Sequence, residues 1–104
     1  LWLTPDQAII LPISDKYMDY AQELVKILDT HNIRVSIDER SEKTGKKIRD
    51  AEMKKIPYML IIGEKEVAEN KISVRQHGMI DLGPMTINDF TLRVEEEIKM
   101  QLNQ

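Results

Sequence analysis

Basic side chains are concentrated in one short stretch of an otherwise acidic chain. The chain has 15 Lys and Arg against 18 Asp and Glu, yet residues 40–55 hold seven basic side chains and only three acidic ones. A local positive stretch on an acidic body indicates a defined site for an anionic partner, whereas overall basicity would favour general adhesion. The alternative is an ordinary solvated helix face. The seven basic residues are Arg40, Lys43, Lys46, Lys47, Arg49, Lys54 and Lys55.

Other candidates for chemistry are few. The chain has no Cys, which excludes a disulfide framework, a thiolate zinc site and a cysteine nucleophile. His31 and His77 lie far apart in no ligand spacing, so no metal site is expected, and His31 fits a structural place at a helix end. Asp38 and Glu39 end a predicted strand without a cooperating His, which favours a loop and capping role over acid–base catalysis. Phosphate-loop and nucleophile-elbow motifs are absent, and no catalytic residue is expected.

Length and composition indicate one ordinary globular domain. The 104 residues are 41% hydrophobic and 32% charged. No apolar run approaches the roughly 18 residues of a membrane span, and no signal-peptide pattern opens the chain. Because the first residue is Leu1, we expect a piece of a longer protein, with Trp2 packing near its terminus.

The elements that position these side chains can be predicted from apolar periodicity. A short apolar run predicts a buried strand over residues 7–13, and a single apolar stripe predicts a helix over residues 17–31. Alternation predicts a half-exposed strand over residues 33–38. Arg34 and Asp38 could pair with the basic stretch where this strand meets the next helix.

The basic stretch itself is predicted to be a helix over residues 44–55. Pro57 ends it and begins the most apolar strand, residues 58–63, which is therefore expected at the centre of a sheet. At 100° per residue, the expected inner side holds Gly45, Ile48, Ala51 and Ile56, and the expected outer side holds Lys43, Lys46, Lys47, Asp50 and Lys54.

The last third of the chain changes pattern. The sequence of residues 64–71 predicts a polar loop with room for one helical turn. Because this connection is too short for a full crossover, the strand over residues 72–76 should be antiparallel to the strand before it. Residues 79–85 suit an edge strand, and Thr86 can cap a final helix. The inner stripe of that helix is Phe90, Val94 and Ile98. This order predicts an open, mixed, three-layer α/β/α domain.

Long ordered stretches of the sequence resemble a known family. These are "EKTGKKIRDAEMKKIPYMLIIGEKE" at residues 42–66 and "SVR" at 73–75 with "DLG" at 81–83, and the opening "LWLTPDQAIILPISDKY" fits as well. They are similar to the C-terminal anticodon-binding domain of class II aminoacyl-tRNA synthetases, most of all in the threonyl branch, over nearly the whole chain. The resemblance implies a five-stranded mixed sheet with one antiparallel strand and helices on both faces.

The resemblance also implies an RNA site. By motif position, Glu66 and Arg75 match residues that contact anticodon bases, and Arg75 has the planar fork that can bond one guanine edge twice. Ser41 stands where the family commonly has Asn, and its shorter hydroxyl would make a shorter or water-bridged contact. The basic helix would then hold stem phosphates. The expected phosphate contacts are Lys43, Lys46, Lys47 and Arg49, with Lys54 as a further candidate.

The partner implied by the resemblance is the anticodon stem-loop of a threonine-accepting tRNA, with no membrane. ATP, Mg and zinc are expected only in the catalytic domain of the parent ligase, so this chain is expected to need no cofactor and to be non-catalytic. A monomeric fragment of a cytoplasmic, homodimeric parent is expected. The alternatives are the same domain from a prolyl-, glycyl- or histidyl-type enzyme, or a receiver- or flavodoxin-like module, whose acidic cluster and phosphate loop the sequence does not match.

Overall fold

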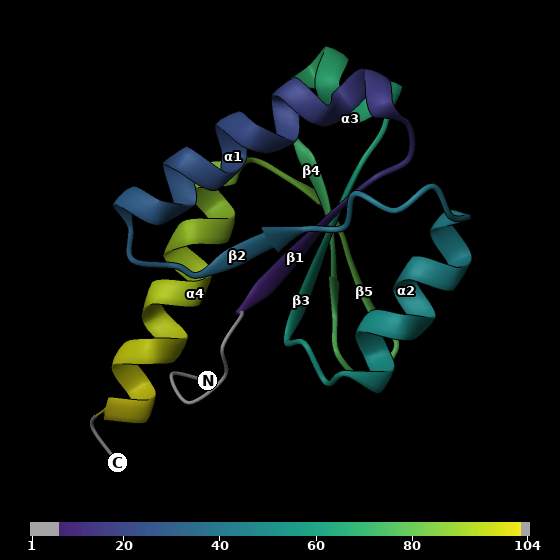
Figure 1. The fold of residues 1–104 in the computed structure, drawn as a ribbon. Coiled ribbons are helices and arrows are strands. Elements are labelled where there is room, and N and C mark those ends of the chain that lie inside the picture. The colour runs from purple at the N-terminus through teal and green to yellow at the C-terminus, as the bar shows by residue number, and fades with distance from the viewer. Residues whose placement is uncertain (1–6, 103–104) are drawn as a thin grey trace.

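A five-stranded mixed sheet with helices on both faces forms the domain (Figure 1). The computed structural model describes residues 7–102, so the expected packing of Trp2 and of the Ile98 side chain lies outside the described residues and side chains. The strands are β1 (Ala8–Pro12), β2 (Val35–Ile37), β3 (Tyr58–Ile62), β4 (Ile72–Gln76) and β5 (Ile80–Met85). The helices are the 3-10 helix η1 (Asp15–Tyr17) and the α-helices α1 (Met18–Thr30), α2 (Thr44–Met53), α3 (Glu64–Glu69) and α4 (Ile87–Leu102).

The strand order is β2-β1-β3-β4-β5. β1 pairs in parallel with both β2 and β3, whereas β4 is antiparallel to its neighbours β3 and β5. The short α3 is too small for a crossover to a parallel strand, which is why β4 turns back beside β3. The predicted three-layer fold with one antiparallel strand, the central place of β3 and the edge place of β5 are confirmed.

Alternation along the strands divides the core between two helix layers. On one face, α1 and α4 cover the larger core, where the rings of Tyr58 and Phe90 meet edge to face with centroids 5.3 Å apart. On the other face, α2 covers a smaller core. The buried residues of that smaller core are Leu11, Ala51, Ile56 and Met59. β1 and β3 are therefore buried on both sides, as their nearly unbroken apolar sequences predict.

The polar segment after β3 is more regular than predicted. α3 extends over six residues, Glu64–Glu69, instead of a loop with one turn. It begins at Gly63, and Asn70 ends it in the left-handed conformation with φ of +57°. The predicted cap of the last helix is confirmed, because Asp89 N donates to Thr86 Oγ1 at 3.2 Å.

The predicted faces of α2 were wrong at two positions. Lys47, placed on the outer side, is buried with only 5% of its surface exposed, and Gly45, placed on the inner side, is exposed. Lys47 lies one turn before Ala51, so the two share a face, and the ends of two strands offer carbonyl partners to its ammonium. The helix is also shorter than predicted, since Lys55 has a φ of +59° and leaves the helical path.

Candidate functional site

The face of the sheet that carries α2 is only partly covered. α2 packs over residues of β1 and β3, and β4 and β5 continue the sheet beside it. Ser73 lies opposite Ile61 and Arg75 lies opposite Met59, so both β4 side chains emerge on the α2 face. Both are half-buried. The sheet therefore presents a polar strip beside the basic helix.

Arg75 occupies the middle of this strip. Its neighbours Ile72 and Val74 are fully buried in the core on the opposite side, as alternation predicts for an Arg that faces away from that core. The side chain is 24% exposed, and Nη1 lies 3.8 Å from Oδ2 of Asp81. Its buried Nε has no hydrogen-bond partner among the described residues. The guanidinium is thus held by one long carboxylate contact and remains partly exposed.

A β-bulge brings Asp81 opposite Arg75. The pairing of β4 with β5 shifts between Val74 and Arg75, so that Val74 faces Gly83 and Arg75 faces Asp81. Gly83 adopts a φ of +81°, a conformation that favours glycine, and its N–H donates to Asp81 Oδ1 at 2.9 Å. Bulges commonly re-aim a side chain next to a functional site. Here the bulge orients the carboxylate toward the guanidinium.

Glu66 projects from α3 with both carboxylate oxygens engaged. Oε1 accepts from the N–H of Gly63 at 2.7 Å, which caps the start of the helix, and Oε2 accepts from Ser73 Oγ at 3.0 Å. Since Ser73 and Arg75 are two residues apart on one strand, the structure brings Glu66 and Arg75 to the same face. The carboxylate oxygens retain further lone pairs for a donor outside the protein.

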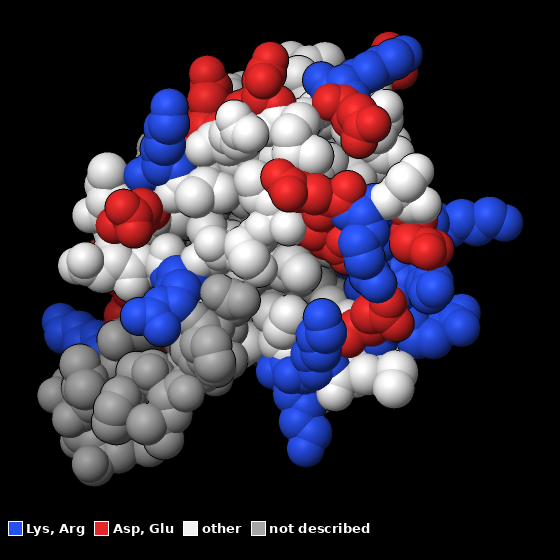
Figure 2. All heavy atoms as spheres, viewed as in Figure 1, with Lys and Arg blue, Asp and Glu red and all other residues white. Residues whose placement is uncertain are grey.

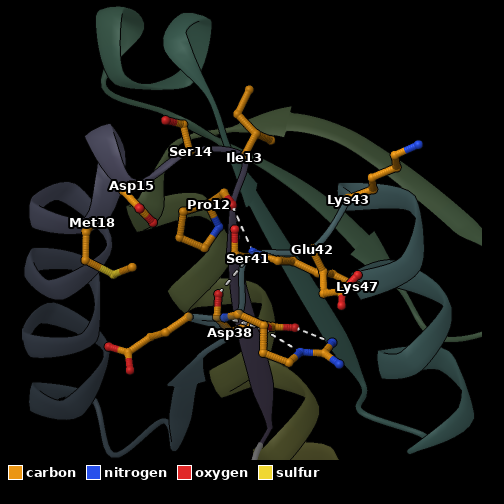
Figure 3. A pocket seen from close by; sticks show the side chains of 12 residues that line it. Pro12, Ile13, Ser14, Asp15, Met18, Asp38, Ser41, Glu42, Lys43 and Lys47 are labelled. Carbon is orange, nitrogen blue, oxygen red and sulfur yellow. Dashed lines mark hydrogen bonds and ion pairs between the residues drawn. The ribbon is translucent and has the colours of Figure 1, made fainter.

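Ser41 lies apart from Arg75 and Glu66, in a hollow of about 370 Å³ (Figure 3). The hollow opens where β1 and β2 end, and Ser41 lines it from the loop between β2 and α2 together with Ile13. A Cβ added at Gly63 would lie 2.7 Å from Ile13 Cδ1, so Ile13 connects this hollow to the first turn of α3. Ser41 is therefore exposed near the Glu66 end of the strip, while Arg75 lies further along β4.

Lys47 forms one wall of the hollow as a structural cation. Its Nζ donates to the carbonyl oxygens of Pro12 at 3.4 Å and Asp38 at 3.3 Å, joining the ends of β1 and β2 (Figure 3). The Asp38 carboxylate instead accepts from Arg40, whose side-chain hydrogen bonds lower the pKa of Asp38 against the effect of its burial. Arg40 also pairs with Asp50 at 2.9 Å. The expected loop and capping role of Asp38, and its pairing with a residue of the basic stretch, are confirmed.

The remaining cations of the stretch form the basic face of α2, which Figure 2 shows as a cluster of Lys and Arg on the side where α2 lies in Figure 1. Lys46 is 3.6 Å from Glu42, an exposed pair of small value. The other four are exposed and make no ion pair within residues 7–102; they are Lys43, Arg49, Lys54 and Lys55. The basic face is thus smaller than the sequence count suggests, but its free charges point to solvent.

The two histidines take structural positions. His31 caps the end of α1, and its Nδ1 lies 2.8 Å from Oε1 of Glu95 on α4, in line with the expected structural role. His77 lies in the turn after β4, where Nε2 is 3.2 Å from the carbonyl oxygen of Glu52. Within residues 7–102, no three His, Asp or Glu side chains come together in a way that could hold a metal ion. None of the helices in this part of the chain has the length and apolar character needed to cross a membrane.

Two residues at this site, Ser73 in the strip and Glu52 on α2, were not predicted. Ser73 could have been found from its place two residues before Arg75, because alternate residues of a strand share a face. Glu52 contacts the turn after β4, 26 residues away in sequence, and no local pattern indicates that contact. Hydrogen bonds from the N–H of Gly78 and then of Met79 lower the pKa of Glu52.

The fold and this strip define an open, mixed-sheet α/β domain with a polar sheet face beside a basic helix. A family model described as an anticodon binding domain matches residues 7–97, and the chain belongs to this family. It is 58% identical over 102 residues to a threonine–tRNA ligase from Cytophaga hutchinsonii and 50% identical over 104 residues to one from Bacteroides thetaiotaomicron. These alignments cover 98% and 100% of the chain but 16% of each relative, so the chain spans about a sixth of their length.

Solved structures agree with this assignment. The RNA binding domain of threonyl-tRNA synthetase from Cryptosporidium parvum Iowa II superposes with a TM-score of 0.82 at 32% identity, covering 91% of this chain and 24% of that one. Histidyl-tRNA synthetase from Nostoc sp. PCC 7120 superposes with a TM-score of 0.83 at 20% identity, covering 91% of this chain and 23% of that one. The second likeness shows the shared fold alone.

Proposed function

We propose that this chain is the anticodon-binding domain of a threonine–tRNA ligase and that it binds the anticodon stem-loop of threonine-accepting tRNA. Relatives at 50–58% identity over nearly the whole chain support the threonyl branch over the prolyl, glycyl and histidyl branches. Arg75 and Glu66 read splayed-out bases on their edges, which is the usual way to read the sequence of an RNA loop.

The observation that carries the proposal is the incomplete pairing of the Arg75 guanidinium. This guanidinium has a single long carboxylate contact of 3.8 Å, and 24% of the side chain is exposed, which leaves part of the planar fork open to a base. Its planar fork matches the two acceptors O6 and N7 of guanine. Threonine anticodons all have G in the middle position, so a reader of guanine is what a threonyl domain requires.

The basic face of α2 holds the phosphate backbone of the stem. Lys43, Lys46 and Arg49 remain the proposed phosphate contacts, because their charges face solvent. Lys47 is withdrawn from that role, since its ammonium is buried against two carbonyl oxygens. Ser41 is retained as a base contact at the rim of the hollow, direct or through a water molecule.

The parent protein is proposed to be a cytoplasmic, homodimeric ligase that attaches threonine to its tRNA. Threonine activation with ATP and Mg, and the zinc of the catalytic domain, belong to parts of the parent outside this chain. This chain is proposed to be a monomer without ligase activity of its own. Supplied with threonine, ATP and tRNA, it should yield no charged product, and sedimentation should report a single copy.

The direct test is binding of this chain to transcribed threonine tRNA and to a panel of other tRNAs of similar length. Preference for the threonine tRNA, lost when its middle anticodon base is changed from G, is the expected result. Equal binding across the panel would refute sequence-specific recognition and leave only general affinity for RNA.

A further inference from the structure

A carboxylate from α2 holds the turn between β4 and β5. Gly78 N donates to Glu52 Oε1 at 3.0 Å, and Met79 N donates to Oε2 at 3.1 Å. The nearby ring of His77 places Nε2 3.7 Å from Oε1. Gly78 and Met79 have φ values of +100° and +65°, and their two successive N–H groups converge on this one carboxylate. Such a concavity is a backbone nest, and here an internal carboxylate fills it.

Glu52 restrains this turn together with the pairing of Gln76 with Ile80 and a hydrogen bond from His77 N to the carbonyl oxygen of Pro57 at 2.9 Å. Positive φ is uncommon for a residue other than glycine, and Met79 gains no burial in return, because it is 72% exposed. Glu52 is by contrast only 15% exposed and gives both of its oxygens to the turn. Hydrogen bonds to an ionised acceptor are about twice as strong as neutral ones. The carboxylate is therefore the side chain that holds the two residues at the tip of the turn.

The turn lies directly beyond the proposed base reader. Arg75 is three residues before Gly78 on the β4 side, and Asp81 is two residues after Met79 on the β5 side. These two side chains face each other across the bulge, so a shift of the turn changes how they meet. Glu52 also feels the positive charge of Arg75. One residue of the basic helix thus contacts the turn that joins the two strands carrying this pair.

We infer that Glu52 is a positioning residue that fixes Arg75 relative to the basic face of α2, and so sets how well the domain discriminates the middle anticodon base. The inference rests on the proposed function. Phosphates bound by α2 and a base bound by β4 belong to one RNA, so the spacing of the two elements must match the spacing in that RNA.

The test compares E52Q with E42Q in this 104-residue chain. Gln keeps the size of the side chain but replaces one acceptor oxygen with a donor, so one of the two turn hydrogen bonds is lost. E42Q makes the same change of charge on the same basic stretch, where Glu42 only approaches Lys46 at 3.6 Å. The RNA probes are a stem-loop with a threonine anticodon and the same stem-loop with its middle G replaced by A.

E42Q should bind both RNAs as tightly as the wild type or more tightly, since it removes a negative charge beside the phosphate site, and E52Q should do the same for the A-containing loop. Only in E52Q should the preference for the G-containing loop fall, by roughly threefold or more. For comparison, complete loss of a bidentate base contact lowers such a preference roughly 5- to 150-fold. In NMR spectra without RNA, E52Q should move the amide signals of Gly78 and Met79 and the Nε–H signal of Arg75, and E42Q should leave them in place.

The two readouts separate the possible failures. If E52Q keeps the preference at the level of E42Q, or if both variants lose it equally, Glu52 does not position the reader. Unmoved signals of Gly78 and Met79 would overturn the carboxylate contact itself. If the wild type shows no preference between the two loops, the proposed function fails, and the contact is then decided by the NMR signals alone.

Discussion

Replacing Arg75 by Ala should abolish recognition of the middle anticodon base and leave the fold nearly intact. The stability cost is small because the ion pair with Asp81 is long and its carboxylate is 65% exposed. Pairs of that kind contribute about 0–1 kcal/mol. Removal of the buried, unpartnered Nε also relieves a desolvation cost that offsets part of the lost packing. We expect a change within about 1 kcal/mol, or a few degrees in Tm.

The effect on binding should be much larger and selective. A bidentate contact from Arg to guanine supplies about 1–3 kcal/mol of discrimination, so the preference for G should fall roughly 5- to 150-fold. The assay titrates labelled stem-loops with the middle G kept or replaced. In the parent enzyme, kcat/KM for aminoacylation should fall while threonine activation is unaffected.

Arg34→Ala is the matched control. Arg34 is an exposed residue that precedes β2, at the opposite edge of the sheet from β5, and its side chain makes no ion pair within the described part of the chain. The substitution removes the same charge without changing the strip, so it should weaken the binding of both RNAs slightly and to the same extent. If R75A retains the wild-type preference for G, or if R34A loses it to the same extent, Arg75 is not the base reader.

Three further outcomes are expected. Lys43→Ala with Lys46→Ala should weaken cognate and non-cognate stem-loops alike and reduce the slope of log K against log salt by about 0.7–0.9 per lost contact; a changed preference would contradict phosphate binding. Lys47→Ala should lower the free energy of unfolding in urea by about 1–3 kcal/mol, because two buried carbonyls lose their donor; an unchanged midpoint would contradict the structural role. Because Arg40 lowers the folded-state pKa of Asp38 below its unfolded value, the stability that Asp38 contributes is present above the unfolded pKa and is lost as pH falls through the folded one. In urea titrations at a series of pH values, Asp38→Asn should remove this part of the fall in the free energy of unfolding toward acid pH. A variant whose stability falls with acid as much as that of the wild type would contradict it.

The sequence predicted the fold well wherever apolar runs had clear boundaries. Pro57 and Gly63 enclose β3, and the alternating residues 72–76 coincide with β4. α3 was underestimated because its acidic first turn and the Glu66 cap read equally well as a polar loop. The bulge at Leu82 was not predicted, since the neighbouring Gly83 was interpreted only as an edge signal.

The candidate site was predicted less completely, for a reason that lies in tertiary contacts. Arg75 and Glu66 were proposed from motif position, and alternation predicted the face of Arg75 correctly. Lys47 was misplaced because helical periodicity locates a side chain on a face but does not show that strand ends from elsewhere will cover it. Glu52 was missed because its partners lie 26 and 27 residues along the chain.

The charged stretch that dominates the sequence therefore has two physical roles. Arg40 and Lys47 bond to Asp38, through its carboxylate and its carbonyl oxygen, and shape the hollow that Ser41 lines. The other cations face solvent, where an RNA backbone could reach them. Glu52 also has a structural contact, because its carboxylate accepts from the N–H groups of Gly78 and Met79 in the turn after β4. Asp50 and Glu52 are consistent with this division: Asp50 pairs with Arg40 in the loop before α2, and Glu52 holds the turn after β4, while the free lysines and Arg49 supply the attraction.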